Sequence, residues 1–342
     1  MKRYGNLFEK IFTQENLYLA YLDARKGKRK KQRCFEFETN LSVNIENLYK
    51  SLHNNTYKPK PYFKFDVYEP KQREIHAPAF CDIVVQHAIY RIIYPIFNVT
   101  FIDTSFACRK CMGTHKASDY TQKCIRFCNS ELYYLKCDIQ KFFYSINRLI
   151  LKSLLEKKIK DKRLINIMML YTELNNKTGI PIGNLLSQLY ALIYLNPLDH
   201  FVKRYLKIKN YVRYVDDFIA IGVSRSNAIL LRLQVEKFIS EVLKLSFSKT
   251  TIQKIRKGIN FVGYRTWKSK RFIRKYSLYK FQKILKKSKL ESIISLLGHA
   301  KQTNSILYMF NKIKEIGSDN IYQRTRRLFK LWKNSGWYGI ET

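Results

Sequence analysis

The clearest pattern of apolar and polar positions lies in residues 211–222. Two runs rich in Tyr, Val, Phe and Ile flank the adjacent carboxylates Asp216 and Asp217. These apolar residue types favour a pleated, largely buried backbone, whereas aspartate is common in turns. The pattern therefore predicts a β-hairpin with both carboxylates at its turn.

Helical and extended patterns alternate along the rest of the chain, which indicates an α+β fold. Helical spacing of apolar residues predicts helices in 5–24, 80–97, 149–173, 189–205, 224–243 and most of 265–342, and a long helix from Phe142. Extended patterns predict a hairpin within 57–79, a strand at 132–139 and short strands at 248–250 and 261–264. The sequence contains no internal repeat and no low-complexity linker.

Composition and charge narrow the class of partner. The 342 residues are 46% hydrophobic, which is typical of a globular protein, and 64 Lys and Arg against 26 Asp and Glu give a net charge of +38. Such a charge predicts a polyanion as partner, because bound phosphates release counterions. Ribosomal and membrane-surface proteins share this charge, but the 25 Tyr and 22 Phe suit stacking on bases.

The N-terminus is too polar for a signal peptide, and no stretch approaches the 18 apolar residues of a membrane span. We therefore expect a cytoplasmic protein with no membrane partner. In that compartment the seven cysteines are expected to be reduced thiols.

Three segments concentrate positive charge. Residues 25–33 form a basic loop that is either a solvated surface run or a phosphate contact. Residues 105–116 form a cationic, glycine-containing turn before a helix, which suits approach to a phosphate chain. Residues 265–342 carry 19 Lys or Arg against 4 acidic residues, and we place a domain boundary near 265.

The adjacent carboxylates need compensation, since like charges in a partly buried turn repel each other and lose hydration. A divalent cation is one solution, and a solvated Asp-Asp turn is the simpler alternative. Asp138 ends the predicted strand 132–139. If that strand neighbours the hairpin, Asp138, Asp216 and Asp217 can hold two cations roughly 3.5–4 Å apart, as in phosphoryl transfer.

The cysteines have spacings that resemble zinc ligands, in Cys108-x-x-Cys111 and Cys124-x-x-x-Cys128, with His115 nearby. However, Cys124 and Cys128 also fit one face of a helix. The sequence leaves open whether these four cysteines bind metal.

Several boxes in order resemble those of reverse transcriptases. Tyr214-Val215-Asp216-Asp217 looks like the metal-binding box, and Asp138-Ile139-Gln140-Lys141-Phe142-Phe143 resembles the first palm motif. Further similar segments are 70–75, 179–188, Lys249 and 261–264, so that the resemblance runs from about residue 15 to 310. It implies a right-hand polymerase with fingers in 1–130, a palm in 131–265 and a helical basic thumb in 266–342.

One segment resembles the corresponding box of diversity-generating retroelement reverse transcriptases, because Ile182 and Gln188 stand on either side of Gly183-Asn184-Leu185-Leu186-Ser187. Residues 109–117 and 295–299 also resemble segments of that family. In that family the aliphatic residue is linked to poor fidelity opposite template adenine. Cys111 and Leu186 depart from the common pattern. Antiviral defence reverse transcriptases share many of these features.

The resemblance assigns roles residue by residue. It implies that Asp138, Asp216 and Asp217 are catalytic and bind two Mg²⁺ ions, or Mn²⁺ in their place, with help from the Ile139 carbonyl. It implies nucleotide binding by Lys71, Arg73, Phe143 (as a steric gate against the ribose 2′-hydroxyl), Ile182, Gln188 and Lys249. It implies template or primer contact by Arg109, Lys110, Gly113, His115, Gly263 and Tyr264.

The implied partners are an RNA template, a DNA primer and product, dNTPs, a dedicated structured RNA and an accessory protein, with homo- or hetero-oligomers possible. No maturase, endonuclease or RNase H domain is expected after residue 342, so template removal and target cleavage would come from elsewhere. The alternatives are an antiviral enzyme copying a non-coding RNA and, in another class, a catalytically idle RNA-binding scaffold. The three intact carboxylates argue against the scaffold.

Overall fold

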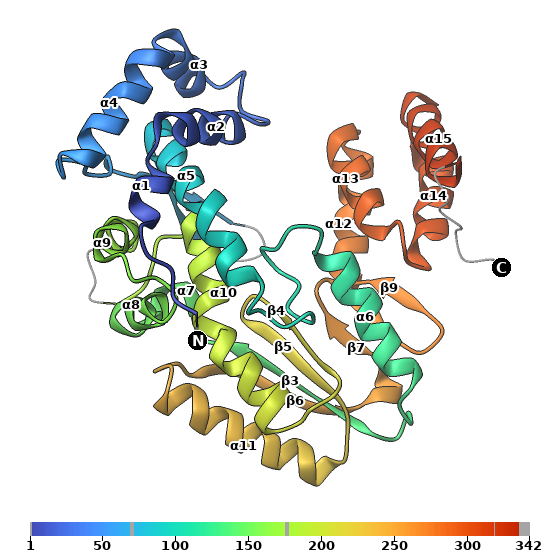
Figure 1. Ribbon diagram of the computed structural model, residues 1–342. Helices are drawn as coiled ribbons and strands as arrows, with labels where there is room; N and C mark the ends of the chain where they lie inside the picture. Colours follow the sequence, from blue (N-terminus) through green and yellow to red (C-terminus); the bar gives the residue numbers. More distant parts are fainter. Residues whose placement is uncertain (1, 69–71, 175–177, 318, 335–342) are drawn as a thin grey trace. The chain divides into compact units, whose positions relative to one another are not determined.

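The computed structural model describes residues 2–68, 72–174, 178–317 and 319–334. Its contacts divide the chain into two compact units. Unit 1 comprises residues 1–109, 137–208 and 231–249, and unit 2 comprises 110–136, 209–230 and 250–342. Each unit is built from helices and β-structure, which confirms the predicted α+β class (Figure 1). The three-domain division of the chain stays a prediction.

Unit 1 is mainly helical. Its elements are α1 (Leu7–Ile11), α2 (Gln14–Ala24), α3 (Gln32–Thr39), α4 (Leu41–His53), β1 (Phe63–Val67), β2 (Arg73–Ala77), α5 (Phe80–Asn98), α7 (Phe142–Ser145), α8 (Arg148–Glu156), α9 (Lys162–Leu170), α10 (Leu185–His200) and the π-helix η1 (Phe201–Tyr205). β1 and β2 form the predicted antiparallel hairpin, with Val67 opposite Arg73.

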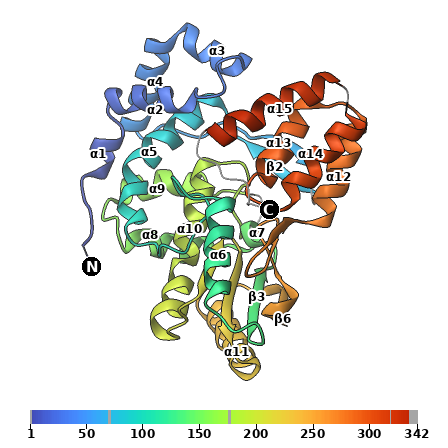
Figure 2. The same cartoon turned by 90° about the vertical axis from the view of Figure 1, so that its right-hand side faces the viewer.

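The core of unit 1 forms around α5, which lies beside α2 in both views (Figures 1 and 2). We expected no segment long and apolar enough to span a membrane. α5 is an exception, because its 19 residues reach the required length and hydropathy. However, 56% of its apolar window is buried inside the protein, as in a core helix. At its start, the buried Asp82 accepts hydrogen bonds from Tyr57 Oη at 2.6 Å and from the Lys60 amide at 2.9 Å.

Unit 2 combines strands with the C-terminal helices. Its elements are α6 (Thr114–Arg126), β4 (Tyr211–Tyr214), β5 (Asp217–Val223), the 3₁₀ turn η2 (Ile255–Lys257), β7 (Ile259–Phe261), β8 (Tyr264–Thr266), β9 (Arg271–Ile273), α12 (Lys275–Lys286), α13 (Leu290–Ala300), α14 (Ser305–Ile316) and α15 (Asp319–Asn334). β7, β8 and β9 form an antiparallel sheet in that order. Helix α6 packs on β4, β5 and β8, and α12 to α14 share an apolar core with Tyr264.

Three elements contribute residues to both units: β3 (Tyr133–Ile139), α11 (Arg225–Glu241) and β6 (Phe247–Lys254). The second sheet has the strand order β4-β5-β3-β6. β3 therefore neighbours the hairpin strand β5 in this sheet.

Two predicted helices have different bounds. The helix from Phe142 is only α7, because the backbone is extended at Ile146 and the Asn147 side chain caps α8 by accepting from the amides of Leu149 and Ile150. The helix expected from residue 189 begins at Leu185. Its first amides donate to Oε1 of the buried Gln86, at 3.0 Å for Leu185.

The segment after β6 also differs from the prediction. Residues 261–264 are a hairpin turn, in which Val262 and Gly263 have φ of 44° and 93°. The segment from 265, predicted to be mainly helical, first completes β8 and then forms β9 before α12 begins. Short three-residue strands give too little alternation for a sequence pattern to detect.

Candidate active site

The Asp216 and Asp217 hairpin has the predicted form. β4 and β5 are antiparallel, with Tyr214 opposite Asp217, so the loop consists of Val215 and Asp216, and Asp217 is the first residue of β5. Val215 has a φ of 55°, which is unusual for a β-branched residue. The fully buried Arg213 supports this turn by donating from Nη1 to the Val215 carbonyl oxygen at 2.9 Å. Such local strain is typical of functional turns.

A cation lies beside Asp217 within unit 2. Nζ of Lys136 on β3 is 2.8 Å from Asp217 Oδ2, and both side chains are about four-fifths buried, with exposed fractions of 20% and 22%. Lys136 also donates to the Asn260 carbonyl oxygen at 3.0 Å. The hairpin carboxylate is thus compensated by positive charge, as expected from the sequence. Lys136 was not predicted, although it lies two residues before Asp138 on the same strand.

Asp138 lies at the end of β3, in the part of the strand that belongs to unit 1. Its Oδ2 accepts a hydrogen bond from Ser248 Oγ at 2.5 Å, and the Asp138 carbonyl oxygen accepts from the same hydroxyl at 3.1 Å. Ser248 precedes the exposed Lys249 on β6. β6 therefore fixes the orientation of Asp138 and carries the lysine predicted to approach the triphosphate.

Oxygen ligands from three carboxylates and one carbonyl are the donors that Mg²⁺ prefers. The ammonium of Lys136 at Asp217 shows that this carboxylate accepts a cationic neighbour at close range. In the part of the chain that the structure describes, no group of three or more His, Cys, Asp and Glu side chains is arranged to hold a metal ion. This applies to the four cysteines as well, and the metal ligands stay a prediction.

The predicted nucleotide-binding residues lie on several elements of unit 1. Arg73 is exposed at the first residue of β2, and Gln188 is exposed on α10. Phe143 is half-buried on α7, where its ring meets that of Phe142 edge-on, with centroids 5.5 Å apart. Lys71 lies outside the described residues.

The loop that carries Ile182 is hydrogen-bonded to the hairpin of β1 and β2. The His76 amide on β2 donates to the Ile182 carbonyl oxygen at 2.7 Å. A Cβ on Gly183, which has a φ of 117°, would lie 2.9 Å from the carbonyl oxygen of His76. Glycine is therefore required here by close contact with β2, and this contact brings Ile182 beside the strand that begins with Arg73.

The predicted template and primer residues differ in accessibility. Arg109 donates to Asn98 Oδ1 at 3.0 Å and to the Ile102 carbonyl oxygen at 2.6 Å, so its side chain stabilises its own loop. Lys110 is exposed, and Gly113 directly precedes α6 with a φ of 137°. Tyr264 is fully buried.

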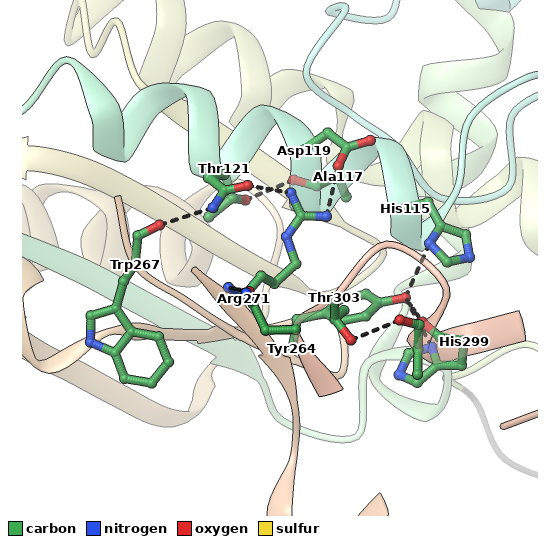
Figure 3. A network of polar contacts seen from close by, with 12 residues as sticks. His115, Ala117, Asp119, Thr121, Tyr264, Trp267, Arg271, His299 and Thr303 are labelled. Carbon is green, nitrogen blue, oxygen red and sulfur yellow. Dashed lines mark hydrogen bonds and ion pairs between the residues drawn. The ribbon is translucent and has the colours of Figure 1, made fainter. Parts of the chain in front are cut away.

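Tyr264 is the centre of a polar cluster that the sequence did not predict (Figure 3). Its hydroxyl lies 3.2 Å from Nδ1 of His115 on α6, 3.0 Å from Nδ1 of His299 on α13 and 2.9 Å from the His299 carbonyl oxygen. The hydroxyl donates to the His299 carbonyl oxygen, and its two lone pairs can accept an N–H from each imidazole. We call His115, Tyr264 and His299 the histidine cluster.

Burial explains the electrostatics of this cluster. It lowers the pKa of His115 and of His299 from the ordinary value, and it raises the pKa of Tyr264 to about 12. Next to the cluster, the buried Arg271 on β9 pairs with Asp119 on α6 at 2.7 Å and donates to Gln122 Oε1 at 2.8 Å. The sheet of β7 to β9 is thereby joined to α6.

Comparisons with known proteins agree with the sequence motifs. The family described as "Reverse transcriptase (RNA-dependent DNA polymerase)" matches residues 58–266. A group II intron-encoded protein, LtrA of Lactococcus lactis subsp. cremoris, is 24% identical over 341 residues, covering 76% of this chain and 56% of that protein. Protein YkfC of Escherichia coli K12 is 23% identical over 291 residues, covering 71% of this chain and 74% of its own length.

The chain thus spans about half the length of LtrA. Among solved structures, apo telomerase from Candida tropicalis aligns at a TM-score of 0.49 and 13% identity, over 79% of this chain and 63% of that one. Telomerase from Candida albicans aligns at a TM-score of 0.48 and 14% identity, over 81% of this chain and 58% of that one.

Proposed function

The chain belongs to the reverse transcriptase family, and from this premise we propose that it extends a DNA primer along an RNA template with dNTPs. The observation that carries the proposal is the match over residues 58–266, which include Asp138, Asp216 and Asp217. The division into fingers at 1–130, palm at 131–265 and thumb at 266–342 is part of the same proposal.

The geometry of β3 supports a shared role for the three carboxylates. Lys136 and Asp138 are two residues apart on one strand, so their side chains point to the same face of the sheet. On that face Lys136 contacts Asp217. We propose that Asp138, Asp216 and Asp217, with the Ile139 carbonyl, bind divalent metal, and that the bound ions activate the primer 3′-hydroxyl and stabilise the leaving pyrophosphate.

The residues of the chain contribute binding and orientation. In the proposal, Arg73, Lys71 and Lys249 bind the triphosphate, Phe143 excludes a ribose 2′-hydroxyl, and Ile182 and Gln188 border the nucleotide. The attachment of the Ile182 loop to β2 supports a position of Ile182 near the strand that begins with Arg73. Positioning and charge of this kind supply most of the catalysis in phosphoryl transfer.

Template and primer contacts involve Lys110, Gly113 and the turn at Val262 and Gly263. Arg109, His115 and Tyr264 act in the proposal by holding these segments, because their polar atoms bond within the protein. A net charge of +38 supports binding to an A-form heteroduplex through its backbone.

The biological role is proposed from the sequence resemblance alone. We assign the enzyme to a retroelement of the diversity-generating type, on the basis of Ile182 and Gln188, acting in the cytoplasm with a structured RNA and an accessory protein. The alternative is an antiviral enzyme that copies a dedicated non-coding RNA.

The test is to purify the protein with its accompanying RNA, add dNTPs and Mg²⁺, and sequence the DNA beside an Asp217→Ala control. Copies of RNA with errors mainly at template adenines would support diversification. Accurate or repetitive DNA from one small RNA would support the antiviral role instead. If neither protein makes DNA, even on an added primer and template, the polymerase proposal fails and the RNA-binding scaffold remains.

A further inference from the structure

The outer face of the β7-β8-β9 sheet carries a groove that none of the proposed polymerase contacts uses. The groove has a volume of about 590 Å³ and lies wholly within unit 2. Its lining residues come from the three strands and the first turn of α12, and they are Asn260, Arg265, Trp267, Phe272, Ile273, Arg274, Lys275, Tyr276 and Leu278.

The strand register places a row of side chains across this face. Asn260 on β7 is opposite Arg265 on β8, and Arg265 is opposite Phe272 on β9. Directly opposed residues share a face of the sheet. Asn260 and Arg265 in this row are exposed. The neighbouring residues Tyr264 and Arg271 point to the opposite face of the sheet, which is buried and contains the histidine cluster. Figure 3 shows the Trp267 indole apart from His115 and His299.

The aromatic side chains are held in place by their neighbours. The Trp267 indole N–H donates to the Arg256 carbonyl oxygen at 3.2 Å, and the Arg265 guanidinium lies over the indole, 5.1 Å from its ring centroid. Phe272 meets Trp267 edge-on, with centroids 6.0 Å apart. Tyr276 lines the groove with 62% of its surface exposed. Trp267 and Phe272 thus hold each other in place, and Tyr276 is largely open to solvent.

The charge of the groove is uniformly positive. Arg265, Arg274 and Lys275 are exposed around it, and its described lining contains no acidic residue. Lys275 and Tyr276 also begin α12, where backbone amides and the helix dipole favour anions. Aromatic faces bordered by cations are the features that bind unpaired nucleotides, because bases stack on the rings while phosphates approach the cations.

We infer that this groove binds an unpaired nucleotide segment, with a base stacked on Tyr276, its polar edge facing Asn260, and its phosphates facing Arg265, Arg274 and Lys275. RNA and single-stranded DNA share this chemistry, so either the template or the product could supply the segment. The inference requires binding alone, and its failure is therefore distinguishable from a failure of the proposed polymerase activity.

The experiment measures binding of the full chain to a labelled, unstructured oligonucleotide of about 12 nucleotides at about 0.15 M salt. Three variants are compared by fluorescence anisotropy: Tyr276→Ala, Tyr276→Phe and the control Tyr279→Ala. Tyr279 lies on the same helix, is 65% exposed and does not line the groove. Both tyrosines are exposed, so all three variants are expected to fold, which thermal melts would verify.

We expect Tyr276→Ala to weaken binding about 5- to 20-fold, Tyr276→Phe to restore it, and Tyr279→Ala to change it little. Lys275→Gln should lower the dependence of log affinity on log salt by about one. Comparing RNA and single-stranded DNA of the same sequence shows which of the two the groove binds. A blunt-ended duplex should not compete with the labelled oligonucleotide for the groove.

Equal effects of the two alanine variants, or no recovery in Tyr276→Phe, would overturn the inference. Photo-crosslinking with 4-thiouridine RNA, or with 4-thiothymidine DNA, gives an independent readout. Adducts within 260–278 that disappear in Tyr276→Ala would support the inference, and adducts confined to other segments would contradict it.

Discussion

A Cβ atom on Gly263 would lie 3.0 Å from both Cε1 and Nε2 of His299. The His299 ring is also stacked on Tyr264, with centroids 4.5 Å apart. The glycine of this turn therefore leaves room for a histidine of α13, in addition to allowing the backbone a φ of 93°. Sequence reasoning assigned Gly263 to close approach of the primer, and the structure provides a second reason for glycine that lies within the protein.

This relationship predicts non-additive effects of substitution. Gly263→Ala should destabilise the protein by about 1–3 kcal/mol, because alanine is strained at positive φ and its methyl group contacts the ring. His299→Ala removes the contact but not the backbone strain. In urea unfolding, the double variant should be more stable than the sum of the two single changes predicts. Strict additivity would contradict a direct contact between the two positions.

The histidine cluster predicts a loss of stability in mild acid. Burial lowers the pKa of both His115 and His299, so the unfolded chain binds protons at a higher pH than the folded protein does. The contribution of the two neutral histidines to the free energy of unfolding is complete above about pH 6.5. It is lost as the pH falls from there toward the pKa values of the histidines in the folded protein. The titratable and charged groups facing the rings are Tyr264, Asp119, Arg271, Arg274 and Lys301.

Thermal melts between pH 8 and pH 5 measure this effect. Wild-type Tm should fall as the pH is lowered through this window, and the fall should be smaller in the double variant His115→Gln/His299→Gln. An identical pH dependence of the two proteins would show that the cluster does not bind its histidines in neutral form.

The ion pair of Lys136 and Asp217 predicts competition with metal. If Mg²⁺ binds Asp217, the Lys136 ammonium must share or leave a carboxylate that it contacts at 2.8 Å. Lys136→Met should therefore lower the half-saturating Mg²⁺ concentration for DNA synthesis by about 2- to 10-fold. Lys254→Met is the control, because it removes a comparable 2.6 Å pair with Glu131 elsewhere in unit 2. An unchanged or higher Mg²⁺ requirement in Lys136→Met alone would refute the competition.

The proposed role of Phe143 as a steric gate predicts that this residue determines the selectivity for dNTPs over NTPs. The ring is half-buried on the short helix α7, whose position is fixed by the Ile180 amide donating to the Phe143 carbonyl oxygen at 2.8 Å. Phe143→Ala should raise the incorporation of NTPs relative to dNTPs about 10- to 100-fold, because space opens beside the 2′-hydroxyl. The ratio of kcat/KM for the two sugars measures this directly, and Phe142→Leu, at the adjacent buried position, is the control. A ratio that stays at the wild-type value would remove Phe143 from the proposed gate.

The elements whose apolar residues recur with a clear helical or strand period were predictable from the sequence. The α+β class, the hairpins of β1 with β2 and β4 with β5, and the reverse transcriptase family were identified correctly. What the sequence missed depends on contacts between distant segments. Gln86 caps α10 from α5, and His299 approaches Gly263 from α13, so neither residue has a local signal. Lys136 could have been found, because strand alternation places it on the face of Asp138.

The central claim is that DNA synthesis depends on Asp138, Asp216 and Asp217, and the most direct measurement is Mg²⁺-dependent primer extension on an RNA template. Each of Asp138→Asn, Asp216→Asn and Asp217→Asn is compared with wild type and with Asp66→Asn, an exposed carboxylate of β1. The account predicts that each of the first three lowers the rate about 1,000-fold or more, whereas Asp66→Asn keeps the wild-type rate and all four retain RNA binding. Near-wild-type synthesis by any of the three variants, or no synthesis by a folded, RNA-bound wild-type protein, would contradict it.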